Sequence, residues 1–207
     1  MFFNPFTSWM TRESFAALVL FALGIATLAL PARAPLLAPL TALAALVFVW
    51  CQGRILHASK GIPAWRQPEI VALTVATGLA EGAGLYLVVA GALGAELPRS
   101  VLALFALALV GRALAWGRYR SALTRGTPKQ VVALLETPGK ALVHAGAVAA
   151  LALLVAGMLF PAVAPLCAPL AGLAALIPGW RFKFVLVTRA SFNQGFALPK
   201  LPVRGTR

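Results

Sequence analysis

Six apolar runs, each close to the length of a membrane-spanning helix, dominate this sequence. They cover residues 14–31, 35–57, 69–95, 98–117, 139–160 and 163–180. A helix of roughly 20 apolar residues crosses the hydrocarbon core of a bilayer. Prolines lie in the short connections between several of these runs and mark them as turns. The sequence therefore predicts an all-α integral membrane protein, a bundle of about six transmembrane helices.

The composition agrees with a membrane location and excludes a soluble domain. The chain is 61% hydrophobic and only 11% charged, whereas soluble domains carry about 25% charged residues. The net charge of +13 would suit a nucleic-acid partner, but the basic residues lie between spanning runs and no nucleic-acid motif accompanies them. Membrane lipid is thus an expected partner and nucleic acid is not.

Basic residues fall unequally on the two sides that six spans create. One side holds only Arg33 and Arg99 of the 18 basic residues. The other holds Arg12, Arg54, Lys60, Arg66, Arg112, Arg118, Arg120, Arg125, Lys129, Lys140, Arg181, Lys183, Arg189, Lys200, Arg204 and Arg207. The positive-inside rule then places both termini and the basic loops in the cytoplasm. We expect a multi-pass protein of a bacterial inner membrane. A basic face that docks a partner would give the same asymmetry.

We expect two parts along the chain. Residues 1–180 form the transmembrane bundle, and residues 181–207 form a basic cytoplasmic or interfacial tail that docks a partner. Arg112 lies inside the fourth run, less than two turns from its basic end, and is predicted to extend its side chain out to the interface.

Glu81 is the only charged residue of the third run between Glu69 and Glu96. It lies near the middle of the run, roughly 20 Å from either end. Thr77, Gly78 and Gly84 share its helical stripe, together with Thr74. A carboxylate in the membrane is costly and is usually functional. The pattern favours a proton-handling group at a ligand site, and a protonated glutamate that bonds neighbouring helices is the alternative.

A second polar cluster, "RILHASKGIPAWR", ends the second run and contains Arg54, His57 and Lys60. The two basic residues are explained by the interface alone. His57 is one of two histidines and can pass a proton near neutral pH. The sequence contains neither a nucleophile–base pair nor a phosphate-binding loop, so a self-contained hydrolase or ATPase is not expected. No metal or haem is expected to be bound by this chain.

Three segments resemble one family. "HASKGIPAWR", then "ATGLAEGAGL", and a terminal "RASFNQGFALPKLPVRG" are similar to membrane anchor subunits of the dimethyl sulfoxide reductase type, within the wider polysulfide reductase anchor group. The resemblance covers the second and third runs and the tail. Dimethyl sulfoxide reductase anchors have eight helices and this chain is predicted to have six, so part of the wall around a quinone site would differ.

The resemblance implies a membrane anchor of a molybdopterin oxidoreductase complex. Such an anchor binds quinone or quinol, either menaquinone or ubiquinone, and exchanges electrons with an iron–sulfur subunit that contacts a molybdenum bis-pterin catalytic subunit. The family's histidine and membrane glutamate fall on His57 and Glu81, which would handle protons. Arg54 or Lys60 would orient the quinone head group, and Thr77, Gly78 and Gly84 would contact its ring. Whether the chain itself counts as an enzyme is left open.

Two other functions are compatible with the sequence. A small transporter or proton channel would place Glu81 on the transport path and would act without partner subunits. A purely structural anchor would have no quinone site, and changes at Glu81 and His57 would affect only assembly.

Overall fold

The computed structural model describes residues 7–190 of the chain. In this range the chain is helical and contains no strand. The helices are α1 (Trp9–Ala29), α2 (Ala34–Ala58), α3 (Glu69–Ala92), α4 (Arg99–Gly126), α5 (Lys129–Val143), α6 (Ala150–Leu159) and α7 (Ala164–Thr188). Short 3₁₀ turns, η1 (Pro31–Arg33) and η3 (Pro161–Val163), precede α2 and α7, and a π-helix, η2 (His144–Ala149), joins α5 to α6.

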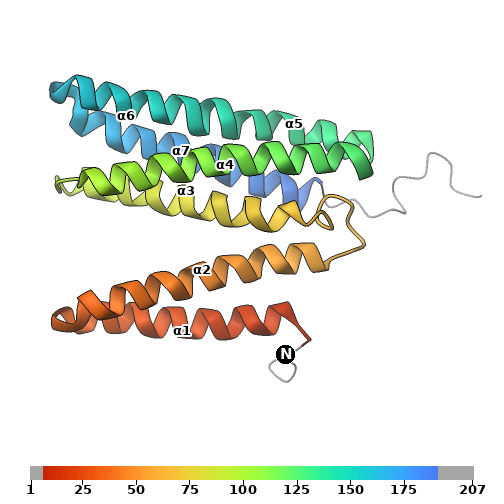
Figure 1. Ribbon diagram of the computed structural model, residues 1–207, viewed down its shortest axis with the longest axis horizontal. Coiled ribbons are helices and arrows are strands. Elements are labelled where there is room, and N and C mark those ends of the chain that lie inside the picture. The colour runs from red at the N-terminus through yellow and green to blue at the C-terminus, as the bar shows by residue number, and fades with distance from the viewer. Residues whose placement is uncertain (1–6, 191–207) are drawn as a thin grey trace, which may run out of the picture.

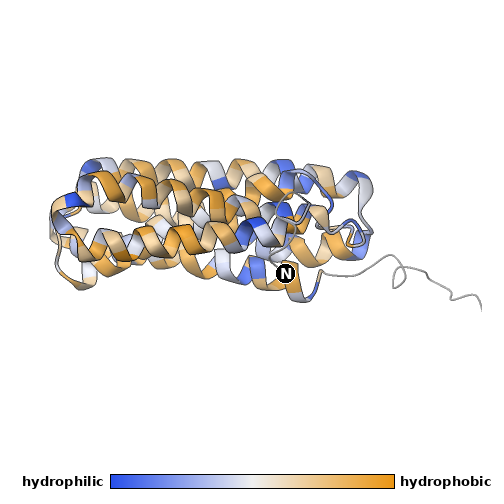
Figure 2. Ribbon diagram, turned by 90° about the horizontal axis from the view of Figure 1, so that it is seen from below, coloured by the Kyte–Doolittle hydropathy of each residue, from blue (hydrophilic) through white to orange (hydrophobic). Residues whose placement is uncertain are grey.

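The predicted fold class is confirmed. Because α5, η2 and α6 are continuous, residues 7–190 contain six helices that are long and apolar enough to cross a membrane. It is a multi-pass membrane protein. Hydrophobic residues cover most of the length of these helices, as the orange ribbon in Figure 2 shows.

Three helices extend well beyond the apolar runs seen in the sequence. α4 continues to Gly126 and α5 begins at Lys129, so the expected long loop after residue 117 is reduced to a short turn. α7 continues to Thr188 rather than ending near residue 180, so the first part of the expected tail is helical. The rest of the tail, residues 191–207, lies outside the described residues.

The extensions form because they are amphipathic. On α5, Val131 and Leu135 are buried while Lys129 and Lys140 are exposed. Arg120 of α4 donates to Glu136 of α5 at 2.8 Å, which links the two extended helices on their polar side. Predicting spans from hydropathy places the end of a helix where charged residues begin. A helix can continue past that point if one of its faces packs on neighbouring helices.

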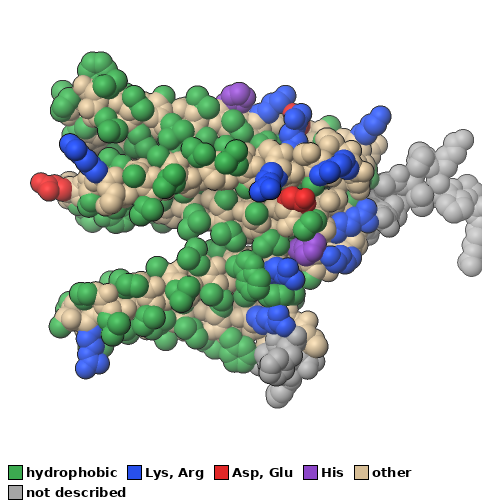
Figure 3. All heavy atoms as spheres, viewed as in Figure 1, with side chains coloured by type: hydrophobic (Ala, Val, Ile, Leu, Met, Phe, Trp, Pro, Cys, Tyr) green, Lys and Arg blue, Asp and Glu red, His purple; other side chains and the backbone are tan. Residues whose placement is uncertain are grey.

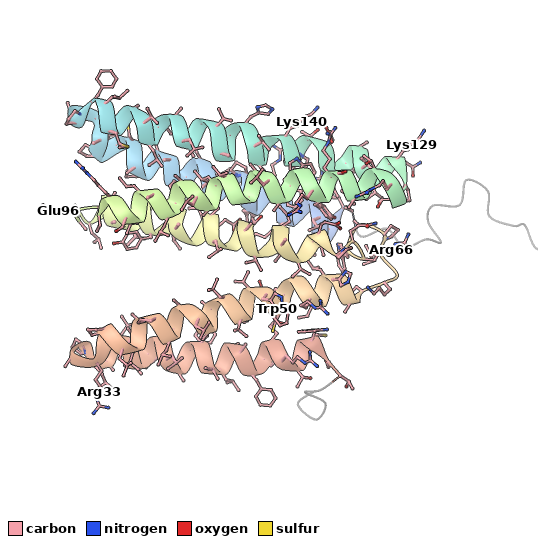
Figure 4. The ribbon with its side chains drawn as sticks, in the orientation of Figure 1. Arg33, Trp50, Arg66, Glu96, Lys129 and Lys140 are labelled. Atoms are coloured by element: carbon pink, nitrogen blue, oxygen red, sulfur yellow. The ribbon has the colours of Figure 1, made fainter. Side chains whose placement is uncertain are left out.

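Figure 1 shows two groups of helices, a bundle of α3 to α7 and a hairpin of α1 and α2 beside it. We call the end that carries Arg66 and Lys129 the basic end, and the end that carries Arg33 and Glu96 the opposite end (Figure 4). The buried core belongs to the bundle. One cluster near the basic end includes Ile70, Trp116, Tyr119 and Phe182, and a second includes Ala80, Leu87, Phe105, Leu109 and Ala171.

The hairpin joins the bundle mainly through α2 and α3. Gly53 of α2 lies against the backbone of Val71, and Gly78 of α3 lies against the side chain of Val49. Beyond these contacts the two helices diverge toward the opposite end, and Figure 3 shows hydrophobic side chains on both sides of the resulting hollow.

Candidate functional site

Glu81 of α3 forms an ion pair with Lys183 of α7. The two residues are far apart in the sequence, and Lys183 lies in the part of α7 that the sequence assigned to the tail. The Glu81 side chain is 13% exposed and that of Lys183 is 45% exposed. The carboxylate is therefore enclosed by helices, while its partner is reachable from outside.

Helix direction explains how these two side chains meet. The Cα–Cβ bond of a helical residue tilts toward the N-terminus of its helix. Because α3 begins at the basic end, Glu81 leans toward that end; α7 begins at the opposite end, so Lys183 leans into the membrane. A lysine this close to a helix end would normally extend outward to water. Here the antiparallel arrangement directs it inward onto the carboxylate.

Glycines on α7 let α3 come close enough for this pair. A Cβ atom at Gly179 would clash with the Oε1 atom of Glu81. One turn further, a Cβ atom at Gly84 would be 2.9 Å from the carbonyl oxygen of Gly172, too short for any side chain. Close contact through small residues is a common way for membrane helices to associate. Gly84, which the sequence assigned to a quinone ring, thus lies in the α3–α7 contact, and Gly78 lies in the α2–α3 contact.

A cavity of about 310 Å³ lies beside the ion pair. Five of its lining side chains are polar or charged: Glu13, Gln52, Thr74, Thr77 and Lys183. The remaining lining is apolar: Met10, Ile55, Leu56, Ile70, Leu73, Phe182, Leu186 and Val187. A mainly apolar cavity with a few converging polar groups is the usual form of a small-molecule site.

Two buried oxygen atoms at this site lack a hydrogen-bond partner among the described residues. They are Thr77 Oγ1 and Glu81 Oε1. Thr77 is only 1% exposed and lies one turn before Glu81 on the same stripe of α3. A buried polar atom without a partner costs about 1–3 kcal/mol. Thr77 lines the cavity, so its hydroxyl is available to a polar group that enters, whereas Glu81 reaches the cavity only through its partner Lys183.

Arg54, His57 and Lys60 form a separate group near the end of α2. Lys60 Nζ lies 3.3 Å from His57 Nε2, and the Arg54 guanidinium stacks over the ring of Trp9, 4.6 Å from its centroid. These three residues do not line the cavity, although Gln52, Ile55 and Leu56 of the same helix do. The structure thus brings Thr77 and Glu81 together with Lys183 rather than with the cluster on α2.

Arg112 corrects an expectation from the sequence. It does not extend to the interface; it is fully buried. Its guanidinium donates to the carbonyl oxygens of Ala175 at 2.8 Å and of Gly146 at 2.6 Å. Ala175 lies next to Ala174 on α7. The carbonyl oxygen of Ala174 has no helical donor, because the residue four positions later, Pro178, has no N–H. The carbonyl oxygen of Gly146 lies in the π-helix η2, where the regular i→i+4 pattern is interrupted.

Arg112 also contributes charge near the ion pair. Its interaction with the Glu81 carboxylate is attractive, so two cations from different helices stabilise one anion. Sequence reasoning missed Lys183 because it lies among basic residues that were assigned to a cytoplasmic tail. The apolar residues Phe182, Val185 and Leu186 around it were the available signal, since they continue the buried stripe of α7.

Comparison with known protein families, with characterised proteins and with solved structures finds no match to this chain. The functional argument therefore depends on the geometry of the site and on the residues that form it.

Proposed function

We propose that this chain is the membrane anchor subunit of a molybdopterin oxidoreductase complex, and that it binds quinone or quinol in the cavity beside Glu81 and Lys183. The observation that supports this most is an intramembrane carboxylate, paired with a lysine that itself lines an apolar cavity of about 310 Å³. That volume lies at the lower end of the range for small-molecule sites, about 300–1,000 Å³.

The residues present fit a quinone head group, which needs flat apolar walls and a hydrogen bond at each oxygen. Phe182, Leu73 and Ile70 supply apolar walls. The Thr77 hydroxyl, buried and without a partner, and the Lys183 ammonium can each donate to an oxygen. When bound, quinol supplies two electrons and two protons.

Glu81 is the proposed proton acceptor. Its Oε1 atom has no hydrogen-bond partner among the described residues, while its other oxygen is held by Lys183. Lys183 would stabilise negative charge at the site because its ammonium group is partly removed from water. His57, in the last turn of α2 with Lys60 beside it, would relay the proton to water.

The partner subunits would dock at the basic end. This end carries most of the chain's Lys and Arg residues, including Arg118, Arg120 and Arg125 of α4 (Figure 3). In the proposed complex an iron–sulfur subunit docks there, contacts a molybdenum bis-pterin subunit, and exchanges electrons with the quinone site in either direction. The basic end would then face the cytoplasm of a bacterial inner membrane.

The test uses the intact complex purified from native membranes in mild detergent. Replacing Glu81→Gln is expected to abolish quinone-linked turnover and to leave turnover with an artificial dye unchanged, because the dye reaches the partner subunits directly. Glu96→Gln is the matched control, since Glu96 lies at the opposite end. Unchanged quinone activity in the Glu81 variant would overturn the proposal. Purification of the chain without an iron–sulfur partner would favour a transporter.

A further inference from the structure

A second cavity lies on the hairpin, away from the proposed quinone site. It has a volume of about 560 Å³ and lies between α1 and α2. Its lining residues form one stripe on each helix: Arg12, Phe15, Ala16, Val19 and Leu23 on α1, and Leu40, Leu43, Ala44 and Val47 on α2. Except for Arg12, every lining residue is apolar. We call this cavity the hairpin groove.

The spacing of these residues makes the groove long and narrow. Positions three and four apart lie on one face of a helix, so each stripe runs along its helix. From Arg12 to Leu23 a helix rises about 16 Å, which is close to the thickness of one leaflet of the hydrocarbon core, about 15 Å. Ala16 and Ala44 are the small residues of the two stripes and leave the space that larger side chains would fill.

Specific contacts join α1 to α2 beyond each end of the groove. Near the basic end, the Trp9 and Trp50 rings meet edge to face, with their centroids 5.0 Å apart. Toward the opposite end, the hydroxyl groups of Thr27 and Thr41 are hydrogen-bonded at 3.0 Å. Tryptophans favour the level of the lipid head groups, so this end of the groove is at the membrane surface.

Two guanidinium groups stack on the ring of Trp9 at the head-group level. Arg12 lies 4.2 Å from the centroid of the Trp9 ring and Arg54 lies 4.6 Å from it. The buried Nε atom of Arg54 has no hydrogen-bond partner among the described residues. Glu13, the adjacent carboxylate on α1, lines the other cavity. Guanidinium groups bind phosphate oxygens through paired hydrogen bonds.

From these observations we infer that the hairpin groove binds one anionic phospholipid. An acyl chain lies in the groove against Ala16 and Ala44. Arg12 and Arg54 bind the head-group phosphate beside Trp9. Among residues 7–190, α1 packs mainly on α2 and contributes little to the buried core, so no other described helix fills the groove. This inference does not depend on the proposed quinone site.

The test is a titration of the full, delipidated chain with phosphatidylglycerol and with phosphatidylcholine of the same acyl chains, followed by native mass spectrometry. Attraction to anionic lipid is worth about 1 kcal/mol for each basic residue at the surface. We therefore expect phosphatidylglycerol to bind roughly 30-fold more tightly. Equal binding of the two lipids would overturn the inference.

Variants locate the site. Arg12→Gln combined with Arg54→Gln is expected to remove the preference, whereas Arg118→Gln, a change of an exposed arginine of α4 at the basic end, is expected to retain it. Ala16→Leu combined with Ala44→Leu fills the groove without changing its charge, so the affinity for both lipids should fall. A preference that survives the double arginine variant, or an affinity that is unchanged in the double leucine variant, would show that the lipid binds elsewhere. Far-UV circular dichroism checks that each variant is folded.

Discussion

Arg112 and Lys183 are both cations inside the helical bundle, and the structure uses them differently. Arg112 is fully buried and donates to main-chain carbonyl oxygens on α7 and η2. Lys183 is about half exposed, borders a cavity and pairs with a carboxylate. The first holds irregular helices together, and the second leaves a titratable group next to an open space. The contrast teaches that two cations inside one bundle can differ in access: main chain encloses Arg112, whereas Lys183 borders a cavity that a ligand could enter.

The largest effect is expected from Arg112→Met. The change leaves the carbonyl oxygens of Gly146 and Ala175 without this donor in an enclosed region. A hydrogen bond to a charged group is worth about 1.5–3 kcal/mol, so we expect the loss of two to lower the free energy of unfolding by roughly 3–6 kcal/mol. Unfolding in detergent, followed by circular dichroism, measures this.

Arg112→Lys is the control for charge. An ammonium group lacks the planar fork of a guanidinium, so it is expected to restore only part of the lost stability. If Arg112→Met were as stable as the wild type, the carbonyl contacts would not hold the bundle, and the contrast with Lys183 would lose its basis.

A smaller effect is expected at the ion pair, and it should depend on both partners. Glu81→Gln or Lys183→Met alone leaves one charge without its partner, whereas the double change leaves none. We expect the double variant to be more stable than the sum of the single effects predicts, by about 0.5–3 kcal/mol. The measurement is a double-mutant cycle on the free energy of unfolding. Additive effects would mean that the two side chains do not interact.

The smallest effect on stability is expected from Thr77→Val. Threonine and valine side chains have nearly the same shape, and the Thr77 hydroxyl has no hydrogen-bond partner among the described residues. Stability should stay the same or rise by about 1 kcal/mol. Affinity for a soluble quinone analogue, measured by competition in the intact complex, should fall about tenfold, a loss of about 1.4 kcal/mol. A stability loss with unchanged affinity would assign Thr77 to packing instead.

Part of the candidate site was predictable. A lone glutamate in a long apolar run indicates a carboxylate that needs a hydrogen-bond or ion-pair partner. Helical spacing also places the buried Thr77 one turn before Glu81 on the same face of α3. The partner was not predictable, because Lys183 becomes adjacent to Glu81 only when α3 and α7 pack antiparallel. The roles of Gly84 and Gly172 likewise depend on which faces of the two helices meet.

The sequence by itself determined that this is a helical membrane protein with six spans, because run length and hydropathy are local properties that the bilayer thickness converts into helices. It also determined that Glu81 is a carboxylate in the middle of an apolar span. Tertiary structure decided which cations compensate it, where the cavity lies, and that Arg112 is enclosed rather than exposed. These features depend on helix direction, on close contact through glycines and on main-chain carbonyl groups next to Pro178 and in η2, and they arise only when several segments pack together.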